Sequence, residues 1–336
     1  FIDACNKAFA SNDDNALLKI TGGGADAAQS SYNNFWGPYR GNLSNSYWQH
    51  DFAVQTMTGT MPIYNEEGNK ITHTIIVKND KGEEVEQTHP RFPYELAEKQ
   101  IICDTLEEVG HFDPRPLLKL GTASGNDTTG VKDPKLFRKY YFKGSGFTSA
   151  TGPIGQAENF WGRTEAITDA KDGEGRWLYS NGAPYVLTTY AELLFDLAEV
   201  QFKYGSKADA FETWKKAIAA DMEFSAKYIQ KESLATVGGK VYHQGDKVDQ
   251  ATFKAMAQEY LNGPFVAGLP MSEFSLSHIM MQKFDALYPW GAAEVWVDQR
   301  KYHYDIDYTG EYPYPGNGYD KTTVTMKKDS DPNKVY

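Results

Sequence analysis

Positive charge is in short supply in this chain. Its 34 Lys and Arg residues stand against 45 Asp and Glu residues, which gives a formal net charge of -11. Because nucleic-acid phosphates require a basic protein surface, this balance argues against a nucleic-acid partner. Long hydrophobic runs are also missing, since no apolar stretch approaches the ~20 residues that a membrane-spanning helix requires. We therefore expect no membrane span within this sequence.

Recognisable catalytic and metal-binding motifs are lacking as well. The two cysteines, Cys5 and Cys103, have no CxxC spacing, and each lies in a mixed-apolar helical context. Two buried thiols are predicted, with a disulfide between them as the alternative. The seven histidines have no zinc-site spacing, and no nucleophile elbow, His-Glu-x-x-His helix or phosphate-binding loop occurs. Absence of a motif only weakens the case for an enzyme, because a glycosidase needs no more than two carboxylic acids.

Aromatic residues, by contrast, are abundant. Tyr, Phe and Trp make up 14% of the chain, and many lie in Gly- and Asn-rich segments. Aromatic faces stack on sugar rings and on peptide side chains, so these segments could present a ligand-binding surface. The alternative is that the rings fill the core.

Two stretches carry the helical periodicity around which the chain is organised. In 188–222, Leu194, Leu197 and Ala198 share one apolar stripe, and Phe211, Trp214 and Ile218 share another, at the i, i+3, i+4 spacing of amphipathic helices. Gly205 can take a left-handed cap conformation and Ser206 can cap the next helix, so an antiparallel helical hairpin is predicted. The second stretch, 277–306, places Met280, Phe284 and Leu287 on one face, then breaks at Pro289-Trp290-Gly291 and resumes as a further helix.

Together these stretches resemble the SusD/RagB family of outer-membrane nutrient-binding lipoproteins, more closely its SusD-like branch. Three further stretches agree in order: Ser11-Asn-Asp-Asp-Asn-Ala-Leu17, Asp113-Pro-Arg115 and Phe160-Trp-Gly-Arg163. The resemblance spans about residues 8–306 and is loosest between 61 and 91. It implies a mostly α fold of tetratricopeptide-like helical hairpins, with long loops and a small β-hairpin packed on one side. In this family Asp-Pro-Arg is a scaffold feature, and we expect Arg115 to be paired with a carboxylate.

The elements between these stretches define the expected organisation of one SusD-like domain over 1–336. A β-hairpin insertion is predicted at 61–93 with a turn at 79–82, a helix at 93–110, a loop-rich ligand-side region at 121–182 and a tetratricopeptide-like region at 185–306. A polar loop at 238–248 and a short helix at 250–260 are predicted within the last region. Because the chain begins as if inside a helix and ends in a polar strand-like run, we expect a fragment lacking both natural ends, with targeting segments outside it.

The irregular segments supply the candidate ligand-binding residues. Residues 21–48 and 121–182 combine glycines with large aromatics, and such long structureless segments are more often functional than idle. The candidates are Trp36, Tyr39, Trp48, Asn34, Trp161, Arg163 and Trp177. An acidic run at 169–174 has the composition of a calcium loop but lacks the spacing of an EF-hand, so a structural calcium is only an option and a solvated turn is the default.

The resemblance implies a non-catalytic function at the cell surface. Such a protein would be held to the extracellular face of the outer membrane by an N-terminal lipid outside this fragment. It would capture oligosaccharides or peptides and deliver them to a SusC-like TonB-dependent transporter, without an organic cofactor. Two other classes stay open: an all-α enzyme that cleaves glycans, and a helical-repeat scaffold for protein partners.

Overall fold

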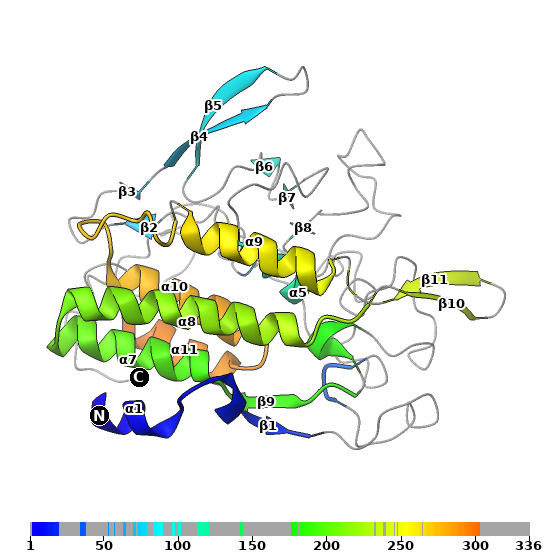
Figure 1. The fold of residues 1–336 in the computed structure, drawn as a ribbon, viewed down its shortest axis with the longest axis horizontal. Coiled ribbons are helices and arrows are strands. Elements are labelled where there is room, and N and C mark those ends of the chain that lie inside the picture. The colour runs from blue at the N-terminus through cyan, green and yellow to red at the C-terminus, as the bar shows by residue number, and fades with distance from the viewer. Residues whose placement is uncertain are drawn as a thin grey trace.

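The computed structural model of this chain shows a body of helices with small antiparallel sheets around it (Figure 1). It describes residues 2–19, 34–37, 53, 57, 63–64, 70–71, 73–78, 83–89, 96–97, 100–101, 113–120, 142–143, 176–180, 182–231, 233–237, 240–244, 246, 248–263 and 265–302. The α-helices in these ranges are α1 (Ile2–Ala8), α5 (Pro116–Lys119), α7 (Tyr190–Tyr204), α8 (Lys207–Lys227), α9 (Gln250–Asn262), α10 (Leu276–Leu287) and α11 (Ala292–Tyr302). The expectation of a mostly helical fold is therefore confirmed.

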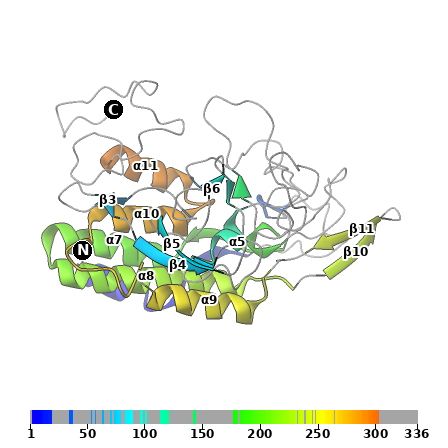
Figure 2. The same ribbon diagram turned by 90° about the horizontal axis from the view of Figure 1, so that it is seen from above.

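The helices stack in successive layers. The hairpin of α7 and α8 forms the centre, with α9 against α8 on one side and α10 against both helices on the other (Figure 2). α11 follows α10 and packs on its outer side. No helix in the described ranges is both long enough and apolar enough to cross a membrane.

The central hairpin forms for the local reasons that the sequence indicates. Thr189 caps α7 by accepting a hydrogen bond from the Glu192 backbone N–H, and the Glu192 carboxylate accepts one from the Thr189 backbone N–H. Ser206 caps α8 in the same way through the Asp209 N–H. Gly205 differs from the prediction: its φ of -129° is not left-handed. A Cβ at this position would lie 3.1 Å from the Gln201 carbonyl oxygen, so glycine is favoured here by close backbone approach.

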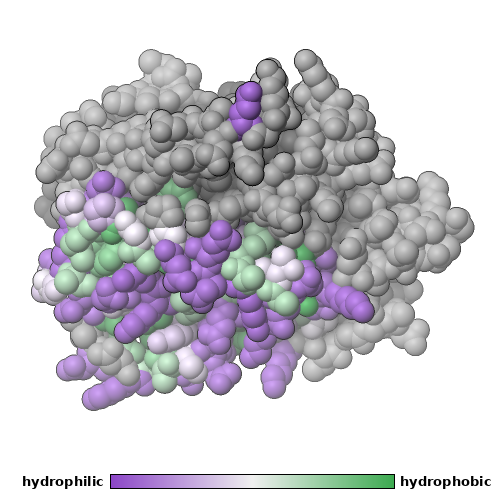
Figure 3. Space-filling model, turned by 45° about the horizontal axis from the view of Figure 1, so that its top comes forward, coloured by the Kyte–Doolittle hydropathy of each residue, from purple (hydrophilic) through white to green (hydrophobic). Residues whose placement is uncertain are grey.

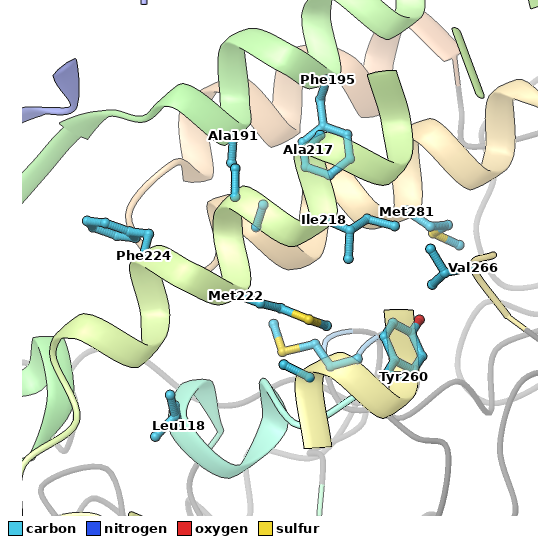
Figure 4. Close-up of a cluster of buried hydrophobic side chains, with 14 of the residues drawn as sticks. Leu118, Ala191, Phe195, Ala217, Ile218, Met222, Phe224, Tyr260, Val266 and Met281 are labelled. Carbon is cyan, nitrogen blue, oxygen red and sulfur yellow. The ribbon is translucent and has the colours of Figure 1, made fainter. Parts of the chain in front are cut away.

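The predicted apolar stripes meet in the core between the helices. Figure 4 shows Phe195 of α7 beside Ala217 and Ile218 of α8, with Met222 pointing toward the α9 side chain of Tyr260. These side chains are all nearly inaccessible to solvent. Burying a large apolar side chain contributes about 1.5–3 kcal/mol, so this core supplies most of the stabilisation of the helical layers.

The strands form small sheets at the edges of the helical body. They are β1 (Ala16–Leu18) with β9 (Tyr185–Thr188), β2 (Ile63–Tyr64) with β3 (Lys70–Ile71), β4 (His73–Lys78) with β5 (Glu84–His89), β10 (Ser233–Val237) with β11 (Lys240–Gln244), and β6 (Leu96–Ala97), β7 (Gln100–Ile101) and β8 (Phe142–Lys143). The β4–β5 and β10–β11 hairpins extend away from the helices in Figure 1.

The predicted hairpin at 61–93 is confirmed in its central part, because β4 and β5 pair from His73 with His89 to Lys78 with Glu84. Two other predictions are wrong. The polar loop expected at 238–248 contains a strand over 240–244, since β11 pairs with β10 across Gly238-Gly239, a dipeptide that favours a two-residue hairpin connection.

The helix expected over 93–110 is also interrupted. β6 and β7 lie within it, and β7 pairs with β8 from about forty residues further along the chain. This distant pairing overrides the local helical periodicity. The Ile102, Leu106 and Val109 positions that suggested the helix lie outside the described residues.

Candidate functional site

Three of the seven candidate residues lie in the described part of the chain. Asn34 and Trp36 come from the first irregular segment and Trp177 from the second. The other four, Tyr39, Trp48, Trp161 and Arg163, lie outside the described residues, as do the acidic run at 169–174 and Cys103. Cys5 is a buried free thiol, as predicted.

Asn34 joins the two irregular segments. Its side chain is 1% exposed, and its Nδ2 donates hydrogen bonds to the carbonyl oxygens of Leu178 at 3.2 Å, Ala183 at 3.0 Å and Pro184 at 3.3 Å. Its Oδ1 accepts a hydrogen bond from the Trp36 backbone N–H at 2.9 Å. The two segments nominated from the sequence therefore do meet in space, although Asn34 is fully occupied in holding them together.

Trp177 fills the core and does not present its ring to solvent. The side chain is 0% exposed, its Nε1 donates to the Ser225 carbonyl oxygen at 2.9 Å, and its ring centre lies 5.6 Å from that of Trp290. Trp36 is also buried, at 8% exposure. The prediction that these two rings stack on a ligand is therefore corrected. Trp177 occupies the space beside α8 and the end of α10, and Trp36 belongs to the same hydrophobic core. A segment without helical period does not reveal this burial.

Phe35 is the exposed aromatic residue of this junction. Its ring is 37% accessible and packs edge-on against Trp36, with ring centres 5.0 Å apart and an interplanar angle of 86°. Phe35 was not among the residues nominated from the sequence. To predict that Trp36 is buried and Phe35 exposed, one must know which of the two rings faces the helices.

Trp177 also has an unusual backbone conformation. Its φ is 42°, in the left-handed region that bulky residues rarely adopt. The surrounding contacts enforce this conformation: the Trp177 backbone N–H donates to Asp246 Oδ2 at 3.2 Å, and the Tyr179 hydroxyl donates to the Lys119 carbonyl oxygen at 2.5 Å. A strained residue of this kind costs about 1–3 kcal/mol and persists only where its neighbours over-determine it.

Asp246 and Arg176 lie together beneath this turn. The Arg176 guanidinium donates to the carbonyl oxygens of Leu118 at 2.6 Å and Leu120 at 2.8 Å and lies 3.4 Å from Asp246 Oδ1. Asp246 Oδ2 also accepts from the Gln230 backbone N–H at 2.7 Å. Burial raises the pKa of Asp246 to about 6, while Arg176 and the two backbone donors act in the opposite direction.

A second buried ionic cluster surrounds Arg115. The guanidinium is 0% exposed and binds Asp113 at 2.5 Å and Asp221 of α8 at 2.9 Å, with Asp285 of α10 at 3.9 Å. It also donates to Gln282 Oε1. The expected pairing of Arg115 with a carboxylate is confirmed. Although burial acts in the opposite direction, Asp113 and the other carboxylates hold the pKa of Arg115 well above its usual value.

Lys119 completes this cluster and was not anticipated from the sequence. Its Nζ lies 3.1 Å from Asp221 Oδ2, donates to the Asp285 and Ala286 carbonyl oxygens at 2.7 and 3.0 Å, and lies 5.2 Å from the Trp290 ring centre. Burial and the adjacent Arg115 lower the pKa of Lys119. The signal that could have found it is its position four residues after Arg115, one turn along α5.

This cluster has a structural role: it holds helices together and is closed to substrates. The side chains of Asp113, Asp221 and Asp285 are 5%, 2% and 1% exposed, so a substrate has no access to them. Each also faces a buried cation, which neutralises the carboxylates and ties α5, α8 and α10 together. Within the described residues, no group of three or more His, Cys, Asp or Glu side chains could hold a metal ion.

The accessible surface of the described residues is mainly polar on the face that Figure 3 shows, with apolar residues in small groups between hydrophilic ones. Comparisons of the chain with protein-family models, with curated proteins and with solved structures find no match.

Proposed function

We propose that this chain belongs to a cell-surface nutrient-binding protein of the SusD/RagB type. It would capture oligosaccharides or peptides and pass them to a SusC-like TonB-dependent transporter at the extracellular face of the outer membrane. The proposal extends to the scaffold, whose helical pairs would be tetratricopeptide-like. The protein would act by binding, with anchoring through a lipid outside the sequence given.

The observation that carries the proposal is the ordered set of motifs described above. Five stretches agree in order with the family pattern, from 11–17 through 113–115 and 160–163 to 188–222 and 277–306. One of them, Asp113-Pro-Arg115, forms the buried ionic cluster beneath the helices, which is consistent with a scaffold role. The helical-hairpin core supports the same assignment, although such a core also occurs in proteins of other functions.

The binding residues proposed for this function are the loop aromatics other than the two buried tryptophans. Tyr39, Trp48 and Trp161 remain candidates for stacking on a ligand, with Arg163 as a polar anchor. Phe35 joins them because its ring is accessible and its neighbour Asn34 is held by four hydrogen bonds. Each stacked ring contributes about 0.5–1.5 kcal/mol, which gives a modest affinity suited to capture and release.

The test is a binding screen against oligosaccharides and peptides, followed by alanine variants at Phe35, Trp48 and Trp161. We expect each variant to weaken binding of the best ligand by roughly 2- to 10-fold, the equivalent of one lost stack. The thermal midpoint should stay close to that of the parent protein. Trp296→Ala is the matched control, because Trp296 is 56% exposed on α11 and lies outside the proposed loops.

Three outcomes would contradict the proposal. Turnover of a polysaccharide would favour a glycan-cleaving enzyme, and a pair of carboxylates facing each other across a cleft would then be sought. If substitutions on the helical faces weaken binding and substitutions of the loop aromatics leave it unchanged, a protein-interaction scaffold is favoured. If the full-length protein, purified from its native membrane, does not bring a large barrel protein with it, the proposed transporter partner is contradicted.

A further inference from the structure

The strained turn at Trp177 connects three parts of the molecule. Through Asp246 it is joined to Gln230, just beyond α8; through Arg176 it is joined to the carbonyl oxygens of α5 and of Leu120. Through the Leu178, Ala183 and Pro184 carbonyl oxygens it receives Asn34. Loss of the turn would therefore also release the segment 34–37.

We propose that Asp246 acts as a pH-responsive latch for the Trp177 turn and, through Asn34, for the docking of segment 34–37. The side chain of Asp246 is 0% exposed, and its Oδ2 holds the Trp177 and Gln230 backbone N–H groups simultaneously. The backbone at Trp177 is strained, so the turn is expected to open when ionisation of the buried Asp246 carboxyl group destabilises the closed state.

The geometry around Arg176 explains why Asp246 is the group that titrates. The shortest hydrogen bonds of the guanidinium go to main-chain carbonyl oxygens, at 2.6 and 2.8 Å, whereas Asp246 lies at 3.4 Å. The ion pair is therefore too weak to offset burial, and the pKa of Asp246 is raised to about 6. Of the described groups that face this pair, Tyr179 and Tyr288 are phenols whose pKa values burial raises, so both stay neutral.

The direction of the pH effect follows from proton linkage. In the open state the carboxyl group of Asp246 meets water, and its pKa returns to about 3.9. Between pH 4 and 6 the closed state then binds more protons than the open state, so acid stabilises the latch. As the pH rises through 6, the buried carboxyl group ionises and that stabilisation is lost. A difference of about 2 pKa units corresponds to a change of up to roughly 100-fold in the opening equilibrium.

Amide hydrogen exchange of the intact protein tests this directly, without any ligand. Exchange of peptides covering 34–37 and 176–184 is measured from pH 5 to pH 8 and corrected for the intrinsic rate. We expect the opening equilibrium of both peptides to rise together by roughly 10-fold, because the rest of the ~100-fold change lies below pH 5. A peptide from the middle of α7, around Phe195, is the internal reference and should show no matching change.

Two variants test whether the pH dependence of opening arises from Asp246. Asp246→Asn should abolish the pH dependence, because the amide does not titrate, whereas Asp298→Asn should retain it. Asp298 is a matched control because it is also a buried aspartate whose pKa is raised by burial, but it pairs with Lys283 at 2.7 Å on another side of the fold.

The proposal is overturned if opening in the parent protein is independent of pH, if it decreases as the pH rises, or if Asp246→Asn keeps the dependence. Should Asp246→Asn fail to fold, infrared detection of a buried protonated carboxyl group decides the question in the parent protein. A carboxyl band lost near pH 6 supports the latch, and its absence at pH 5 contradicts it. Because no ligand enters these measurements, the result is independent of the proposed nutrient binding.

Discussion

The α7–α8 hairpin and the turn around Trp177 are both buried, yet different forces hold them in place. The hairpin joins two apolar stripes with a cap at the start of each helix, all within about forty consecutive residues. The turn has a strained backbone, and its position depends on hydrogen bonds to residues 48 and 69 positions further along the chain. Local pattern is thus sufficient for the first, and the second exists only because other elements surround it.

This difference predicts how each region responds to damage. A segment stabilised by many nearest-neighbour contacts loses them one at a time, whereas buried charges and their partners fail together. Three substitutions, of decreasing expected cost in stability, test this comparison.

Arg115→Met should cause the largest loss of stability, about 3–5 kcal/mol in the free energy of unfolding measured in urea. Removing the guanidinium leaves Asp113 and Asp221 buried without their main counter-charge. Lys227→Met is the control, because Lys227 is exposed and lies 3.9 Å from Asp13, so its loss should be within about 0.5 kcal/mol. Equal effects of the two substitutions would contradict a structural role for the buried cluster.

Trp177→Ala should reduce the free energy of unfolding by about 3 kcal/mol. The lost ring leaves a cavity beside Trp290, a change that costs about 3–5 kcal/mol, and alanine keeps the Cβ that strains the φ of 42°. Trp296→Ala removes the same side chain from an exposed site and should cost much less. A stable Trp177→Ala protein that has lost ligand binding would instead restore Trp177 as a binding residue.

Thr189→Ala should have the smallest effect, a loss of about 1 kcal/mol in thermal or urea unfolding. The substitution removes the oxygen that caps α7 and leaves the apolar stripe intact. Thr189→Ser keeps that oxygen and should recover most of the loss. If Thr189→Ala were as damaging as Arg115→Met, the helical hairpin would not be locally specified.

Much of the fold follows from spacing and caps along the chain. The helices α7 to α11 begin and end near the predicted positions, and β4 pairs with β5 on either side of the predicted turn at 79–82, which lies outside the described residues. The two wrong predictions, the loop at 238–248 and the helix at 93–110, have different causes. The Gly238-Gly239 dipeptide is a local hairpin signal that the predicted loop left out of account, whereas the pairing of β7 with β8 depends on a segment about forty residues away and has no local signature.

The candidate site was harder to predict because aromatic residues occur both in hydrophobic cores and at ligand-binding surfaces. Asn34 donates a hydrogen bond to the Leu178 carbonyl oxygen, so the two segments nominated for binding meet, although the sequence did not indicate which residues would join them. The burial of Asn34 and Trp177 was missed because a glycine-rich segment has no periodicity that separates an inward side chain from an outward one. The pairing of Arg115 with a carboxylate was predicted from the resemblance, in which Asp-Pro-Arg is a scaffold feature, and the structure shows it.

The acidic character of this protein, its central helical hairpin and the salt bridge between Arg115 and Asp113 can be predicted from the sequence, because each depends on composition or on residues close together in the chain. Packing between distant elements, in contrast, makes Trp177 a core residue, brings Lys119 into the ionic cluster and buries Asp246 beneath the turn. Those outcomes depend on residues between 48 and 167 positions apart, and the energy of a buried charge or ring is set by what surrounds it in space.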